Sequence, residues 1–159
     1  MKIELLAVGR LKDGPERELV SRYLTRAKDQ GRMLAVTGFD VIEFSESRAT
    51  RPQDRKSEEA QMIRQRLGGS LYIALDSHGK SIDSEAFTKL ITAFRDSGTR
   101  SLSFLIGGAD GLESSLVKEA HTVIAFGAIT LPHQVARIIL AEQLYRATTL
   151  MSGHPYHRA

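Results

Sequence analysis

Short apolar runs alternate with helix-like segments along this 159-residue chain, and this alternation constrains the fold more than any other feature. The runs are continuously apolar, which is typical of strands buried on both faces. We predict strands over 2–8, 39–44, 71–75, 101–106 and 122–126. Strands separated by helices form sheets covered on both sides, so we predict one α/β domain over 1–159 with a mostly parallel sheet.

Capping residues and prolines indicate where the intervening helices begin. Asp13-Gly14-Pro15-Glu16 predicts a helix with Asp13 as its N-cap, and Ser84 is expected to cap another. Pro132 suits the first turn of the last helix. We predict helices over 13–28, 57–67, 84–97, 113–120 and 132–151.

Composition narrows the function classes. The chain has no cysteine, which excludes disulfides, thiolate zinc sites and cysteine nucleophiles, and the cytosol is the default compartment. Glu4 interrupts the first apolar run, so we expect no signal peptide, and no run is long enough to predict a membrane span. The net charge of +3 permits nucleic acid without requiring it. The cluster Arg48, Arg51, Arg55 and Lys56 is either an RNA contact or ordinary solvated loop charge.

Ligands of such sheets bind outside the carboxyl ends of the strands, here at 75–76, 106–111 and 126–131. The loop 107–111 reads Gly-Gly-Ala-Asp-Gly, which is neither a dinucleotide fingerprint nor a phosphate-binding loop. It is either a ligand-binding loop or a tight turn. The loop 127–134 is small and apolar and opens onto a helix start at His133, so it could hold an adenine-like ligand. The alternative for His133 is a capping or core-edge histidine.

The last helix has apolar residues on more than one face. Val135, Ile138 and Ile139 share a stripe with Glu142, and a second stripe includes Leu140. A helix buried on two sides needs a second cover, so we predict a two-fold homodimer. Glu142 and Arg146 stand at i and i+4, which favours a helix ion pair over a catalytic glutamate.

The chain ends in Gly153-His154-Pro155-Tyr156-His157-Arg158, which combines stacking, hydrogen-bonding and charged side chains. This combination of side chains is suited to binding an unstacked base and its phosphate. Metal binding is the rival, but no third ligand stands at a convincing spacing, so we expect no metal. No G-x-S-x-G motif supports a serine nucleophile.

Four ordered motifs together resemble the ribosomal RNA large-subunit methyltransferase H family, which belongs to the SPOUT class. They are Leu105-Ile106-Gly107-Gly108-Ala109-Asp110-Gly111-Leu112, Thr130-Leu131-Pro132-His133-Gln134, Ala141-Glu142-Gln143-Leu144-Tyr145-Arg146-Ala147 and Gly153-His154-Pro155-Tyr156-His157-Arg158. The resemblance spans the whole chain, beginning with Val8-Gly9-Arg10-Leu11-Lys12.

The resemblance implies a homodimer with a C-terminal trefoil knot, an exception to unknotted topology. It implies an enzyme that uses S-adenosylmethionine, without metal, to methylate N3 of a pseudouridine in large-subunit ribosomal RNA on the assembled ribosome. The implied cofactor-binding residues are Leu75, Gly107, Phe126, Gly127, Ala128, Ile129, Thr130 and Leu131.

The chemistry requires removal of a proton from the imide nitrogen and alignment with the methyl group. We expect Arg158 or another tail cation to stabilise the nitrogen anion, with Tyr156 near the target base. The proton acceptor is expected among His133, His154 and His157. The alternatives are a SPOUT enzyme acting on a ribose or another base, and a non-catalytic ribosome-binding factor.

Overall fold

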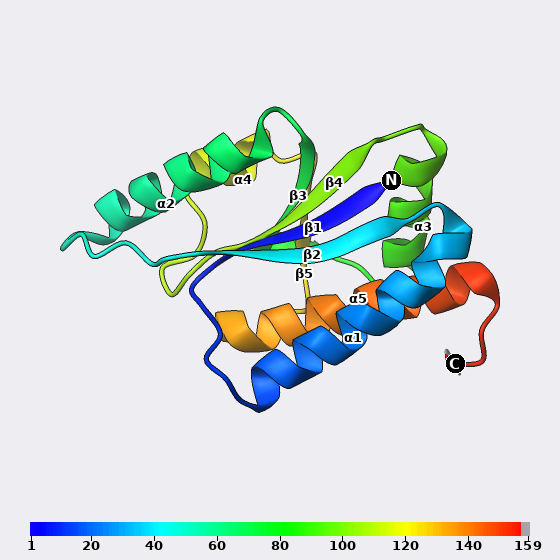
Figure 1. Cartoon of the computed structure of the whole chain (residues 1–159). Coiled ribbons are helices and arrows are strands. Elements are labelled where there is room, and N and C mark those ends of the chain that lie inside the picture. Colours follow the sequence, from blue (N-terminus) through cyan, green and yellow to red (C-terminus); the bar gives the residue numbers. More distant parts are fainter. Residues whose placement is uncertain (157–159) are drawn as a thin grey trace.

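A sheet of five parallel strands, in the order β2-β1-β4-β3-β5, forms the centre of the computed structural model, which describes residues 1–156 (Figure 1). The strands are β1 (Lys2–Val8), β2 (Thr37–Phe44), β3 (Leu71–Ser81), β4 (Ser101–Ile106) and β5 (Thr122–Ala125). The predicted parallel sheet is therefore confirmed. The predicted trefoil knot depends on how the C-terminal segment is threaded, and it stays a prediction.

Helices cover both faces of the sheet, as predicted (Figure 1). They are α1 (Pro15–Gly31), α2 (Pro52–Leu67), α3 (Ser84–Asp96), α4 (Ser114–Glu119) and α5 (His133–Ser152), with a 3-10 turn η1 (Arg32–Leu34) after α1. Side chains of α1, α3 and α5 share one apolar core, and those of α2 and α4 share the other. Alternate residues of β1 serve the two cores: Leu5 faces the first and Leu6 the second. Within residues 1–156, no helix is long and apolar enough to cross a membrane.

Two of the predicted helix caps are wrong. The N-cap of α1 is Gly14, with no side-chain cap, and Asp13 instead lies 3.6 Å from Arg17. The N-cap of α3 is Asp83, whose carboxylate accepts a hydrogen bond from the backbone N–H of Ala86 at 2.7 Å. Ser84 is the first helical residue and donates to Gln143 of α5 at 2.7 Å, so its hydroxyl serves packing between helices.

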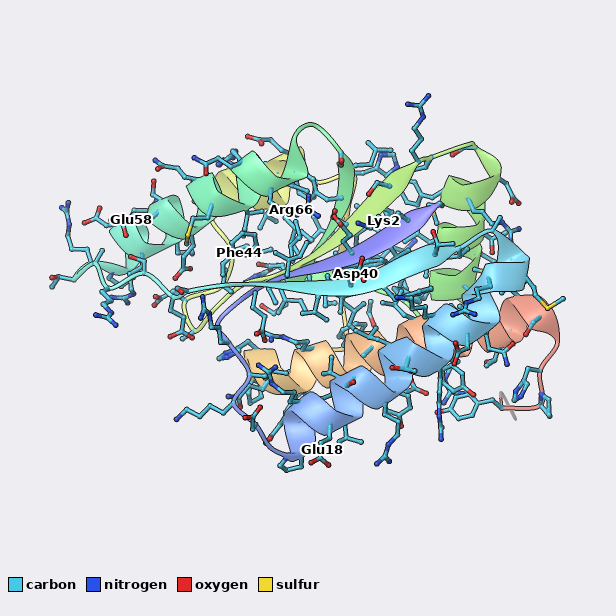
Figure 2. All side chains as sticks on the ribbon, viewed as in Figure 1. Lys2, Glu18, Asp40, Phe44, Glu58 and Arg66 are labelled. Atoms are coloured by element: carbon cyan, nitrogen blue, oxygen red, sulfur yellow. The ribbon has the colours of Figure 1, made fainter. Side chains whose placement is uncertain are left out.

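The helix predicted over 57–67 begins earlier, at Pro52. A proline in the first turn, preceded by Arg51 in an extended conformation, is the same start signal that predicted α1. Because Pro52 stands among charged residues, the sequence there was interpreted as a loop. Phe44 ends β2 and Glu58 stands on α2, and Figure 2 shows the segment between them projecting beyond the sheet.

Strand β3 extends beyond the predicted end at residue 75. Leu75 and Lys80 both pair with Ile124 of β5, so residues 76–79 leave the ladder and the strand then resumes. A Cβ at Gly79 would lie 2.6 Å from the carbonyl carbon of Ile124, so only glycine allows this close approach. The excursion places residues 76–79, which we call the β3 bulge, at the carboxyl end of the sheet.

Candidate functional site

A cavity of about 290 Å³ lies at the carboxyl ends of β3, β4 and β5. Three segments line most of it: residues 75–77, 106–111 and 124–131. His133 and Ala136 at the start of α5 complete the lining. These are the strand ends at which the sequence predicted a ligand, and the parallel sheet brings them together.

Most of the predicted cofactor residues lie on this cavity. The lining includes Leu75, Gly107, Phe126, Gly127, Ile129, Thr130 and Leu131, together with the predicted proton acceptor His133. Ala128 is exposed and is not part of the lining, and it follows Gly127, which has φ of 97°. The roles of these residues in binding stay predictions.

The loop after β4 is both a tight turn and a cavity wall. The N–H of Gly111 donates to the carbonyl of Gly108 at 3.0 Å, which closes the turn. A Cβ at Gly107 would lie 2.6 Å from the backbone nitrogen of Leu112. Glycine at 107 is therefore required by the loop itself, and the two interpretations left open by the sequence describe the same structure.

An ion pair anchors this loop to α2. Arg55 donates to both carboxylate oxygens of Asp110, at 2.6 and 3.0 Å, and its Nη1 also donates to the carbonyls of Ala49 and Thr50 at 3.0 Å. The hydrogen bond from Arg55 lowers the pKa of Asp110. One guanidinium thus holds the cavity wall and the segment before α2 together.

The predicted basic cluster is therefore partly engaged within the chain. Arg55 is paired with Asp110, and Arg51 is paired with Asp54 at 2.7 Å. Arg48 lies on the exposed segment between β2 and α2. An RNA contact through Arg48 or Lys56 stays a prediction, whereas Arg55 has a structural task.

A buried carboxyl group lies behind the same loop. Glu59 of α2 is 6% exposed and accepts a hydrogen bond from the backbone N–H of Ser47 at 2.9 Å. A Cβ at Gly108 would lie 3.8 Å from its Oε2. Burial raises the pKa of Glu59, because its charged form loses hydration.

The charged side chains of the cavity lining are acidic. Among the described residues, no lysine or arginine lines the cavity, and its charged groups are Asp76 and Asp110. Phosphate sites usually include cationic side chains. The lining therefore does not resemble a nucleotide-phosphate site, in keeping with the absence of phosphate-binding motifs in the sequence.

Sequence reasoning missed Arg137, whose side chain is fully buried one turn after His133. Its guanidinium pairs with Glu43 of β2 and donates to the carbonyl of Gly9 at 3.0 Å. Burial lowers the pKa of Arg137, and its Nε has no hydrogen-bond partner among residues 1–156. An arginine between apolar neighbours on a buried helix was the available signal. It ties the start of α5 to the ends of β1 and β2.

The tail folds back onto the C-terminal half of α5. The Tyr156 hydroxyl donates to Glu142 at 3.1 Å, and its ring lies 4.5 Å from the ring of Tyr145 and 5.1 Å from the guanidinium of Arg146. Burial, reinforced by Glu142, raises the pKa of Tyr156 to about 12. The predicted ion pair between Glu142 and Arg146 is confirmed at 2.6 Å.

Within one chain, this tail does not reach the cavity. Glu142, the partner of Tyr156, follows His133 by nine residues on α5, roughly 13 Å along the helix axis. His154 donates its backbone N–H to Thr149 at 2.9 Å and lies farther along the helix. His157 and Arg158 lie outside the described residues. The structure brings His133 to the cavity but places His154 and Tyr156 elsewhere.

The stripe of α5 that the sequence expected to be buried twice is only partly covered by this chain. Val135 is 38% exposed, and Ile138 and Ile139 are half-buried. Ile129, on the loop before α5, is 76% exposed. The opposite side of the helix, which includes Leu140 and Leu144, is fully buried in the core.

Comparisons with known proteins agree on one family. A family model described as "Predicted SPOUT methyltransferase" matches residues 1–157. A protein of Rhizobium etli named ribosomal RNA large subunit methyltransferase H is 52% identical over 159 residues, covering 99% of each chain. A protein of the same name from Beijerinckia indica is 50% identical over 160 residues, covering 100% of each.

Solved structures share the fold at low identity. A probable methyltransferase from Bordetella pertussis superposes with a TM-score of 0.56 at 14% identity, covering 92% of this chain and 95% of that one. A probable methylase family protein from Haemophilus influenzae gives a TM-score of 0.54 at 11% identity, covering 99% of this chain and 70% of that one. At such identities the likeness concerns the fold alone.

Proposed function

Because the chain belongs to the SPOUT methyltransferase family, we propose that it transfers a methyl group from S-adenosylmethionine to N3 of a pseudouridine in large-subunit ribosomal RNA. The names of its full-length relatives support the RNA substrate. We propose that the substrate is the assembled ribosome, which places the activity in the cytoplasm, and that residues 1–159 act as one domain.

The observation that carries this proposal is the cavity at the carboxyl ends of β3, β4 and β5. Its volume of about 290 Å³ is close to the lower end of small-molecule sites, about 300–1,000 Å³, and suits a cofactor held in a bent form. Its apolar and backbone-rich lining fits an adenine ring and a thioether, and the lack of lysine and arginine among its described lining residues suits a cationic donor.

Three segments would hold the cofactor. Leu75 and the loop 126–131 would enclose the adenosine, and Gly107 would let the β4 loop approach it closely. When bound, S-adenosylmethionine supplies an electrophilic methyl group on a sulfonium centre. The order that Arg55 and Arg137 impose on the surrounding loops limits the reorganisation needed before reaction.

The target nitrogen must lose its proton as it attacks the methyl carbon. His133 is the predicted proton acceptor that lies on the cavity, at the start of α5. Arg158 would stabilise the nitrogen anion, Tyr156 would pack beside the base, and His154 and His157 are the other candidates for the proton.

The distance between the cavity and the tail leads us to propose a homodimer. We infer that the partly exposed stripe containing Val135 and Ile139 packs against a second copy, and that the tail of one copy reaches the cavity of the other. The threading of the C-terminal segment as a trefoil knot belongs to the same proposal. Sedimentation at micromolar concentration is expected to give twice the chain mass of 17.6 kDa.

The decisive experiment is incubation of the protein with methyl-labelled S-adenosylmethionine and, in parallel, ribosomes, separated subunits and free ribosomal RNA. We expect label in the large-subunit RNA of ribosomes, and mass mapping is expected to locate it on the base of a pseudouridine. A matched reaction contains His133→Ala, which we expect to bind the cofactor and to transfer slowly.

Label on a ribose or on another base would replace the proposed target with that of another SPOUT enzyme. Ribosome binding without any cofactor binding would instead support a non-catalytic ribosome-binding factor.

A further inference from the structure

We propose that Asp76 determines the preference of the cavity for the methyl donor over the spent product. Its carboxylate attracts the sulfonium charge of S-adenosylmethionine, which S-adenosylhomocysteine lacks. This inference rests on the proposed function and assigns a further residue to the cofactor site.

The β3 bulge holds Asp76 on the cavity. Because residues 76–79 leave the ladder between Leu75 and Lys80, Asp76 lies at the cavity rim instead of in the sheet. Its Oδ1 accepts hydrogen bonds from the backbone N–H of His78 at 2.8 Å and from the ring Nδ1 of His78 at 3.0 Å. An aspartate bonded to the backbone two residues ahead stabilises a turn, so its orientation is fixed before any ligand binds.

The second carboxylate oxygen is left for a ligand. Among residues 1–156, Oδ2 of Asp76 makes no hydrogen bond, and the side chain is 22% exposed. The His78 side chain is 94% exposed, so any charge on it is screened by water. Asp76 therefore presents a negative charge that is only partly hydrated to the cavity.

The other charges around the cavity do not compete with Asp76. Asp110, the second acidic residue of the lining, is matched by the two hydrogen bonds from Arg55. Among the described residues, the lining contains no lysine or arginine that would pair with Asp76. Among the charged side chains of the described lining, Asp76 is thus the one without an arginine or lysine partner, and it stands on the β3 bulge.

The reaction changes the charge that the Asp76 carboxylate acts on. S-adenosylmethionine carries a sulfonium and an ammonium against one carboxylate. As the bond between carbon and nitrogen forms, the bond between carbon and sulfur breaks and its electron pair stays on sulfur, while the proton of the target nitrogen passes to the base. The product is a thioether with one positive charge fewer, so its attraction to Asp76 is weaker and its release is favoured.

Calorimetric titration with three probes tests this: S-adenosylmethionine, the unreactive amine analogue sinefungin, and S-adenosylhomocysteine. For Asp76→Asn, we expect about a tenfold loss of affinity for the two cationic probes, as for the removal of one nearby charge, and little change for S-adenosylhomocysteine. The selectivity of the unmodified protein is expected to shrink in high salt. Asp29→Asn, which removes an exposed charge on α1, is the matched control and is expected to change none of the affinities.

The outcomes separate this inference from the function on which it rests. Equal losses for all three probes would assign Asp76 to a group that donor and product share, and unchanged affinities would remove it from recognition; either result overturns the inference. Retained binding of S-adenosylhomocysteine shows that the variant is folded. If the unmodified protein binds none of the probes, the proposed function itself fails.

Discussion

Arg55 holds Asp110 through two hydrogen bonds, at 2.6 and 3.0 Å, across 55 positions of sequence. The contact joins α2 to the loop after β4, which forms one wall of the cavity. A planar guanidinium makes this two-point contact and a lysine ammonium does not. The position of this loop therefore depends on a residue of helix α2.

Arg55→Lys is expected to weaken binding of S-adenosylmethionine severalfold, because the loop 107–111 loses one of its two anchoring bonds. Calorimetry measures the effect, and thermal unfolding should show little change. Arg51→Lys is the control, since its pair with Asp54 lies on the surface. Equal affinities for the unmodified protein and Arg55→Lys would contradict the anchoring role.

Arg137→Met is expected to destabilise the protein by about 3 kcal/mol, because it leaves the carboxylate of Glu43 without its buried partner. Urea denaturation measures the loss. The double variant with Glu43→Gln is expected to recover part of it, since no carboxylate charge then remains at position 43. Arg22→Met, on the exposed surface of α1, should change stability by less than about 0.5 kcal/mol. A loss no larger than that of Arg22→Met would contradict the prediction.

Glu59→Gln is expected to stabilise the protein near neutral pH. Burial raises the pKa of Glu59 above its ordinary value of 4.5, so ionisation in the folded state costs stability as the pH rises through the raised pKa. Below about pH 4.5 both states are protonated and the cost vanishes. Melting temperatures of the two proteins should therefore converge at low pH and separate by a few degrees at pH 8.

Glutamine can still accept the hydrogen bond from Ser47, which keeps the comparison isosteric. Glu85→Gln, whose side chain is exposed, serves as the control and should give no such pH-dependent difference. A constant difference at all pH values would show that the charge of Glu59 is not its cause.

In a titration to alkaline pH, Tyr156→Phe is expected to remove the signal of one phenol that ionises at a higher pH than an ordinary tyrosine. Because burial raises the pKa of Tyr156 to about 12, its hydroxyl should remain protonated at pH 11, where an ordinary tyrosine is ionised. Phenolate absorbance follows the titration. If Tyr156→Phe removes amplitude near pH 10 instead, the tail does not rest against Glu142 in solution.

A chain that ends at Gly153 should bind S-adenosylmethionine normally and lose methyl transfer to ribosomes. The cavity lies at the opposite end of α5, and retaining Gly153 preserves the helix cap. Calorimetry and label transfer are measured on the same preparation, with a chain lacking Ala159 alone as the control. Normal turnover by the shorter chain would remove the tail from the mechanism.

Periodicity and the strand-end rule predicted the framework and the location of the cavity. Leu75 and Gly107 each follow or end an apolar run, so the parallel arrangement alone brings them together. The ends of elements were less predictable. The predicted strand ended at residue 75, and its continuation to Ser81 depends on Gly79, which allows the close approach to Ile124.

The buried charges could not be predicted from local sequence. Arg137 and Glu43 are 94 positions apart, and nothing in the sequence around either residue identifies the other as its partner. The same holds for Glu59, whose burial results from the packing of α2 on the sheet. The tail showed its chemical character in sequence, but its contact with Glu142 depends on a reversal of the chain after Gly153.

The interior position of β1 in the sheet has a consequence for synthesis. Its two neighbours are β2, which follows soon after, and β4, with Lys2 paired to Ser101. A nascent chain therefore holds a strand with one unsatisfied edge until residue 106 has left the ribosome, and the apolar face against α5 stays uncovered until residue 152 follows. Folding of this protein must wait until nearly the whole chain has been synthesised. During that time its first strands are most able to pair with the wrong partner.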